Sequence, residues 1–389
     1  MAASGGETRF DDPRLRGFVY QALLVLAALG LAGFGAYNAY TNMEARGIPT
    51  GFSFWNQVAG FQINLHLIPY SELSTYGRAF WVGLLNTLLV GAISIPLATA
   101  IGFAIGAARL SPNWLLSRFA LVYTNVLRNT PLLLQLLFWY NAVLKSLPGP
   151  RQSLNFRDVI FLNNRGLFVP RPVPEPPAMW FGVALVAALV AVLLFRLWAK
   201  RRQDRSGAQA PVAAFATLAL VGLPAMAALA AGFPFSLEAA KLAGFNFRGG
   251  IQIIPEMAAL VFGLVTFTSA FIAELVRAGI QSVSHGQSEA AAALGLHRGL
   301  AMRLVILPQA IRLIVPPLTS QYLNIVKNSS LAVFVGYPDL VQIFAGTVLN
   351  QTQAAVQVMA ITMAVYLAIS LLVAAALNAY NASRAWRER

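Results

Sequence analysis

The chain has 389 residues, of which 58% are hydrophobic and only 11% are charged, and its net charge is +14. Soluble proteins carry about 25% charged residues, so most of this surface is predicted to face something other than water. The sequence has no cysteine, which excludes disulfides and thiolate metal sites. Its three histidines lack a metal-binding spacing, which argues against a metalloenzyme or a hydrolase with a histidine base.

Eight segments have the length and apolar character of membrane-spanning helices. A bilayer-spanning helix needs about 20 mostly apolar residues, and the sequence therefore predicts an all-α polytopic membrane protein. Basic residues precede the first segment, but its apolar stretch is longer than a signal-peptide core, so we interpret it as a retained anchor. The predicted spans are residues 17–37, 80–107, 129–147, 178–195, 212–233, 257–280, 304–326 and 355–381.

The distribution of lysine and arginine predicts the orientation of these spans. Cytoplasmic segments carry an excess of basic residues. With both termini in the cytoplasm, 18 basic residues lie inside and nine outside, and Lys327 lies near a span end. The net charge is thus explained by a membrane surface, and no nucleic-acid partner is needed.

The segments between the spans differ in character. Residues 148–177 contain seven prolines, so we expect an ordered external loop that is not helical throughout. Residues 38–78 form a second external segment, and residues 196–211 are expected to form a short basic cytoplasmic turn. In the second span, Ala98, Gly102 and Gly106 form a ladder of small residues that predicts close packing of another helix.

The cytoplasmic loop between the sixth and seventh spans, residues 282–308, holds the most informative pattern. Ser288 is a candidate cap for a short helix through Leu294, with Glu289 near its positive N-terminal end. Gly295 predicts a C-terminal stop, and a second amphipathic turn then leads to Pro308. A surface loop without a partner and a docking element for another protein both fit these residues.

This loop resembles the EAA signature of ABC importer permeases, E-A-A-x3-G-x9-I-x-L-P. Val305 replaces the isoleucine and keeps its β-branched character. The resemblance implies that the chain is the transmembrane domain of a type I ABC importer in a bacterial inner membrane. It also implies that the loop at residues 282–308 docks into a cleft of the ATPase subunit. The residues that carry this expected coupling role are Glu289, Ala290, Ala291, Gly295, Leu307 and Pro308.

Three other segments, residues 127–138, 271–283 and 327–331, resemble permeases for polar amino acids. Five spans (second, third, sixth, seventh and eighth) then form the family's five-helix core. Together with residues 75–78 and 83–88, the enlarged arrangement is similar to general L-amino-acid permeases of the Aap/Bzt type. We expect residues 1–79 to hold the tail, first span and external loop, and 80–389 the permease domain, with an insertion and two extra helices at about 148–255.

The sequence contains no G-x-x-x-x-G-K-[ST] phosphate-binding loop. The chain is therefore expected to be a transport subunit without enzymatic activity or a cofactor of its own, while ATP and magnesium bind to a separate ATPase homodimer. The resemblance further implies a second related permease in a heterodimer, a periplasmic amino-acid-binding protein and an L-amino-acid substrate.

Polar residues within the spans are candidates for function, because they are costly in a bilayer. Glu274 and Arg277 lie three residues apart and are expected to pair on one helix face, either as a local brace or as a gate. A candidate substrate path consists of five uncharged polar residues and one lysine. The uncharged side chains could bind a zwitterion, or they could form hydrogen bonds between helices. The residues are Asn86, Gln135, Thr268, Gln321, Asn324 and Lys327.

Two other classes of protein compete with the importer hypothesis. An ion-coupled secondary transporter for small polar solutes would favour carboxylates at mid-membrane, and none of the 14 acidic residues lies clearly at the centre of a predicted span. A membrane enzyme would need a cluster of catalytic groups, and the sequence shows none. The ion-coupled transporter is the alternative that we retain.

Overall fold

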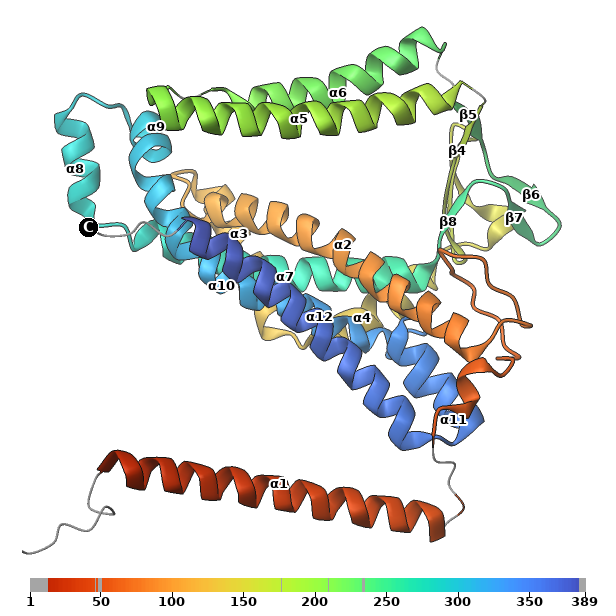
Figure 1. The fold of residues 1–389 in the computed structure, drawn as a ribbon. Coiled ribbons are helices and arrows are strands. Elements are labelled where there is room, and N and C mark those ends of the chain that lie inside the picture. Colours follow the sequence, from red (N-terminus) through yellow and green to blue (C-terminus); the bar gives the residue numbers. More distant parts are fainter. Residues whose placement is uncertain are drawn as a thin grey trace, which may run out of the picture. The chain divides into compact units, whose positions relative to one another are not determined.

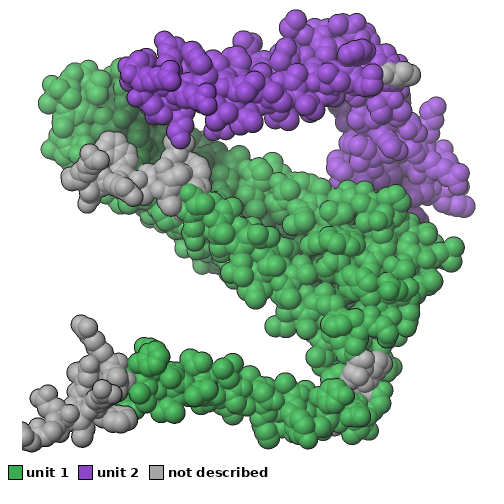
Figure 2. All heavy atoms as spheres, in the orientation of Figure 1, with its two compact units in different colours: residues 1–133, 264–389 green, residues 134–263 purple. Residues whose placement is uncertain are grey.

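The computed structural model describes residues 13–384, except residues 46, 48–50, 176, 209, 233 and 234. The chain forms two compact units, one of residues 1–133 and 264–389 and the other of residues 134–263 (Figure 2). Helices dominate both units (Figure 1). We refer to them as unit 1 and unit 2 and treat each by itself.

Six helices in the described part of the chain are long and apolar enough to cross a membrane. Two shorter apolar helical segments, residues 132–144 and helix α6, match the remaining predicted spans. The prediction of a helical polytopic membrane protein is therefore confirmed, and short strands occur in addition to the helices. The long helices are α1 (Pro13–Ala45), α2 (Tyr76–Arg109), α5 (Ala178–Ser206), α7 (Pro255–Gln281), α10 (Leu307–Asn328) with its flanking turns, and α12 (Ala355–Arg384); the shorter ones are α4 (Leu132–Leu137), which continues as a π-helix to Leu144, and α6 (Val212–Ala230).

Two segments are helical where the sequence analysis did not expect a helix. Helix α5 continues through Arg196–Ser206, so the predicted turn at 196–211 is mostly wrong; lysine, arginine and glutamine are good helix formers. The helix ends at Gly207, whose φ of +65° suits glycine. Helix α3 (Trp114–Asn129) is capped by Asn113, whose Oδ1 accepts the Leu116 N–H at 3.2 Å. Polar residues lower the hydropathy of this helix below that of a membrane span, so the sequence analysis did not predict it.

Small residues of α2 bring α7 unusually close, as the ladder predicted. Ala98 is fully buried. A Cβ atom on Gly102 would lie 2.6 Å from Cβ of Ile272, and one on Gly106 would lie 2.7 Å from Cβ of Val276. The backbones are therefore packed at a distance that only glycine permits. This contact continues into a buried cluster that includes Ile314 of α10.

A second core of unit 1 surrounds the other end of α2. Tyr337, Leu340 and Phe344 are fully buried there, and Phe344 packs edge-to-face on Phe80 at 5.3 Å between ring centroids. Residues 341–348 form a π-helix that leads into α11 (Leu349–Thr352). The segment at residues 52–70 contributes Phe54 and Ile63 to the same core.

Short strands occupy the loops of unit 2 that precede α5 and follow α6, a feature that the sequence analysis did not anticipate. Proline disfavours α-helix in residues 148–177; their strands pair partly with each other and partly with residues 235–253. One sheet has the antiparallel order β1-β2-β3-β8, and two ribbons pair β4 with β5 and β6 with β7. The strands are β1 (Leu154–Phe156), β2 (Ile160–Asn163), β3 (Gly166–Val169), β4 (Arg171–Pro174), β5 (Phe235–Glu238), β6 (Lys241–Ala243), β7 (Asn246–Arg248) and β8 (Ile251–Ile253).

The two helices of unit 2 between these strands form an antiparallel hairpin (Figure 1). Phe195 of α5 stacks on Phe215 of α6 with 4.0 Å between ring centroids. Strand β4 leads into the start of α5 and β5 follows the end of α6, so the β4–β5 ribbon lies at the open end of the hairpin. Most side chains of α5 are exposed within the single chain, as expected for a helix in contact with lipid or another subunit.

Candidate functional site

The signature loop forms a short helix, α8 (His285–Ala293), followed by α9 (Arg298–Ala301). Helix α8 begins four residues earlier than expected, so Ser288 lies inside it and is not its cap; Ser284 precedes it without a side-chain capping bond. Glu289 is therefore past the first turn. Its Oε1 lies 3.0 Å from Nδ1 of His285, and both side chains are exposed.

The end of α8 is a Schellman motif built around Gly295. The Leu296 N–H donates to the Ala291 carbonyl at 3.0 Å, and the Gly295 N–H donates to the Ala292 carbonyl at 2.9 Å. Gly295 has φ of +75°, and a Cβ atom there would meet nothing within 4 Å. Glycine is thus required by backbone conformation alone, and the predicted stop is observed.

The two alanines of the signature differ in their exposure. Ala291 is 2% exposed, because α8 packs this face on the π-helical turn at residues 302–306. Ala290 is exposed, and Leu294 at the end of α8 is 80% exposed. A hydrogen bond of 3.2 Å from Gln309 to Gln287 also joins α8 to α10. The helix is therefore braced on α10 and presents its outer face freely.

Leu307 and Pro308 begin α10 without interrupting the helical path. Residues 298–334 form one continuous helical segment, and a π-helical turn, Met302–Ile306, immediately precedes Leu307. A proline in a helix removes an N–H and crowds the carbonyl four residues earlier, and a wider π turn relieves this crowding. The expected separate turn before Pro308 is thus the first part of the membrane helix.

The Glu274 carboxylate joins three helix ends of unit 1. Its Oε1 accepts bonds from Arg277, including one from Nε at 3.1 Å. Its Oε2 accepts from Arg109 at the end of α2, and it lies 3.7 Å from Nη1 of Arg128 at the end of α3. The expected pair is observed. The two additional arginines make it a clamp between helices, and a gating role stays a prediction.

The structure does not bring the candidate path residues into one described cluster. Asn86 is fully buried, and its Nδ2 donates to the carbonyls of Leu65 and Pro338 at 2.8 Å each, so it binds backbone. Thr268 is also buried. In α10, Gln321 is half-buried, whereas Asn324 and Lys327 are exposed. Gln135 belongs to unit 2. A substrate path through these six residues stays a prediction.

Sequence reasoning missed a buried carboxylate, Asp339, which lies between two spans. It is fully buried, its Oδ1 accepts the Gln342 N–H at 2.8 Å, and its Oδ2 accepts the Tyr366 hydroxyl at 3.1 Å. Burial raises the pKa of Asp339 to about 7. The signal was present in Tyr337-Pro338-Asp339, where an aspartate follows a turn and precedes a helix. These bonds give it a structural role in joining α12 to the segment after α10.

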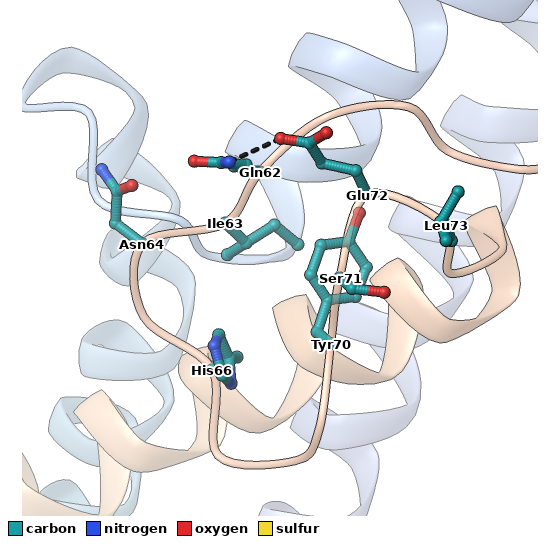
Figure 3. Close-up of a pocket in the computed structure, with 8 residues that line it drawn as sticks. All are labelled: Gln62, Ile63, Asn64, His66, Tyr70, Ser71, Glu72 and Leu73. Carbon is teal, nitrogen blue, oxygen red and sulfur yellow. Dashed lines mark hydrogen bonds between the residues drawn. The ribbon is translucent and has the colours of Figure 1, made fainter.

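A polar hollow of about 500 Å³ lies in the loop before α2. Figure 3 shows that its lining side chains come from one loop, and that Gln62 donates a hydrogen bond to Glu72 across it. The side chains lining it are Gln62, Ile63, Asn64, His66, Tyr70, Ser71, Glu72 and Leu73. No residue of the signature loop lines this hollow.

Residues 99–387 match the family described as the inner membrane component of binding-protein-dependent transport systems. This match covers the clamp around Glu274, helix α8 with its Schellman end, and the π turn before Pro308. The chain belongs to this family, whose members are multi-pass proteins of the inner membrane.

Relatives along nearly the whole chain narrow the family to the amino-acid ABC transporter permeases. YhdX of Escherichia coli (strain K12), whose name describes an amino-acid ABC transporter permease, is 50% identical over 99% of this chain and 98% of its own. AapQ of Rhizobium johnstonii, named a general L-amino acid transport system permease protein, is 44% identical over 97% and 94%. BztB of Rhodobacter capsulatus, named a glutamate/glutamine/aspartate/asparagine transport system permease protein, is 40% identical over 97% and 96%. The resemblance seen in the sequence is confirmed.

Proposed function

We propose that this chain is the permease subunit of an ATP-driven importer that moves L-amino acids, polar and acidic ones included, across the bacterial inner membrane by alternating access. The names of AapQ and BztB support the substrate class. ATP and magnesium bind to a separate ATPase homodimer. A second related permease and a periplasmic amino-acid-binding protein complete the complex.

Helix α8 is the observation that carries this proposal. A coupling element must transmit the closure of the ATPase as a rigid displacement of the membrane helices. Helix α8 meets this need, because it packs through Ala291 on the start of the α10 segment and ends in a fixed Schellman turn. Its outer face, with Ala290 and Leu294, is free for a cleft on the ATPase.

The source of energy distinguishes the importer from the ion-coupled alternative. The chain is reconstituted in proteoliposomes with its binding protein, second permease and ATPase. We expect amino-acid uptake that requires ATP and stops when the ATPase is inactivated by substitution. Uptake by this chain alone, driven by a proton or sodium gradient, would refute the proposal.

The outer face of α8 is tested by Leu294→Asp. A charge on this exposed side chain is compatible with the folded chain, but in a docked interface it would be buried without a partner, which costs a few kcal/mol. We expect at least a tenfold loss of ATPase association, measured by co-purification. The matched control, Leu237→Asp on exposed strand β5, should associate normally. Equal association of both variants would remove α8 from the interface.

A further inference from the structure

The last turns of α5 carry a dense group of basic residues without acidic partners. Of the six charged residues in this segment only Asp204 is acidic, and all six side chains are exposed. Within the described ranges, none of the five basic side chains forms an ion pair with a carboxylate. We call this group the α5 basic segment; it consists of Arg196, Lys200, Arg201, Arg202 and Arg205.

The charges of the α5 basic segment surround the helix. At about 100° per residue, the five positions spread over roughly 240° of the circumference. The remaining arc is centred on Ala199, which is 5% exposed because it faces the rest of the hairpin. A protein that docked on one side would meet only part of these charges. A layer of anionic groups around the helix would meet all of them.

Two exposed tryptophans set the depth of α5 in the bilayer. Trp180 and Trp198 are 18 positions apart, which corresponds to roughly 27 Å of helix. The hydrocarbon core is about 30 Å thick, and tryptophan is enriched at its two boundaries. Lys200–Arg205 therefore follows directly at the level of the lipid headgroups. The guanidinium of Arg202 lies over the Trp198 ring, 5.3 Å from its centroid, which is within the roughly 6 Å of a cation–π contact.

The end of α5 also extends beyond its partner helix. The stacked pair Phe195–Phe215 aligns the two helices of the hairpin. From this pair α6 extends only to Val212, whereas α5 continues to Ser206, so the last turns of α5 have no helical neighbour within the hairpin. Their side chains are free to reach the surrounding headgroups.

We propose that the α5 basic segment is a binding site for anionic phospholipid headgroups of the leaflet in which α5 ends. The lysine and arginine side chains contact the phosphates, and Trp198 anchors the helix at the boundary. Each basic residue near an anionic membrane surface contributes about 1 kcal/mol, which corresponds to an enrichment of anionic over zwitterionic lipid on the order of fivefold.

The absence of cysteine allows a direct test. Leu197→Cys, at a half-exposed position on the basic side of α5, is labelled with a fluorophore in nanodiscs of phosphatidylcholine. A small fraction of either brominated phosphatidylglycerol or brominated phosphatidylcholine is then added as a quencher. We expect several-fold stronger quenching by the phosphatidylglycerol, and a loss of this preference at high salt because of screening. Equal quenching by the two lipids would overturn the proposal, and this comparison needs no change of charge.

Charge substitutions identify the residues responsible. Replacing Lys200, Arg201, Arg202 and Arg205 by glutamine should abolish the preference for phosphatidylglycerol. The matched control replaces four exposed basic residues of the strands and their turns, Arg165, Arg171, Lys241 and Arg248, by glutamine and should keep it. Loss of the preference in both variants would mean a general effect of net charge and would contradict a site. Two results together would assign the segment to a protein partner instead. The protein with all its basic residues intact would show no lipid preference, and ATPase co-purification would be lost only in the variant with the four α5 substitutions.

Discussion

At the scale of single residues, neighbours in the signature loop have different physical roles. Ala291 is small because it packs on its own chain, and Gly295 is glycine because its backbone is left-handed. Only the outer residues, such as Ala290 and Leu294, are free to meet another protein. A charge at Ala291 would therefore disturb the packing of α8 on the α10 segment. A loss of ATPase binding in such a variant could not be attributed to the docking surface alone.

We predict that Gly295→Val uncouples the importer and Gly295→Asn largely preserves it. A β-branched residue at φ of +75° costs about 1–2 kcal/mol, whereas asparagine tolerates this conformation. A Cβ atom at this position would meet nothing within 4 Å in either variant. The measurement is ATPase activity stimulated by loaded binding protein. Equal stimulation in the two variants would show that the bend does not matter.

Asp339 gives a prediction for pH. Its folded pKa, about 7, is above the ordinary value of 3.8, so the folded state binds the proton more tightly than the unfolded state. This contribution to stability is complete below the ordinary pKa and is lost as the pH rises through about 7. We expect the Tm of the purified protein to fall between about pH 4 and about pH 7 and to level off above that range. In Asp339→Asn, which keeps an acceptor for the Gln342 N–H, this part of the fall should disappear.

At the scale of helices, the contact of α2 with α7 depends on the absence of side chains. Gly102 and Gly106 face Ile272 and Val276 at distances that exclude a Cβ atom. The clamp around Glu274 fixes the same helices at their ends. Close packing along α2 and α7 and charge pairing at their ends therefore hold the same two helices together. Helix α7 ends at Gln281 and leads into the loop that carries α8.

Gly102→Ala is predicted to destabilise the protein, and Gly91→Ala to leave it unchanged or slightly more stable. The added methyl group at residue 102 would overlap Ile272, and overpacking of this kind costs about 1–3 kcal/mol. At residue 91 it would meet nothing within 4 Å, and alanine is the better helix former. Thermal unfolding in nanodiscs compares the two. A Tm of Gly102→Ala at or above that of Gly91→Ala would contradict tight packing.

At the scale of the whole molecule, the excess of inside lysine and arginine predicts that both termini are cytoplasmic. Reporter fusions after Arg205 and at the C-terminus should be active in the cytoplasm, and a fusion near Gly149 should be active in the periplasm. The same orientation places α8 on the side where ATP is available. A periplasmic reporter signal from the C-terminal fusion would reverse the orientation and remove the coupling role of α8.

The sequence by itself determined the membrane class, the approximate spans and the family. Hydrophobic length and the E-A-A-x3-G spacing are local properties, so they can be recognised without knowing which residues pack against them. Gly295 could be assigned for the same reason, because its left-handed backbone belongs to the end of one helix. The pairing of Glu274 with Arg277 is also local, since both lie on one helix face.

Contacts between distant segments were decided only by the tertiary structure. The burial of Ala291 depends on the turn at 302–306, and the full clamp at Glu274 depends on Arg109 and Arg128 from two other helices. The strands at 154–174 depend on partners at 235–253 for part of their hydrogen bonds. Asp339 is buried because α2 and α12 surround it. No pattern within one segment contains this information, because burial and pairing are set by the neighbours that folding brings together.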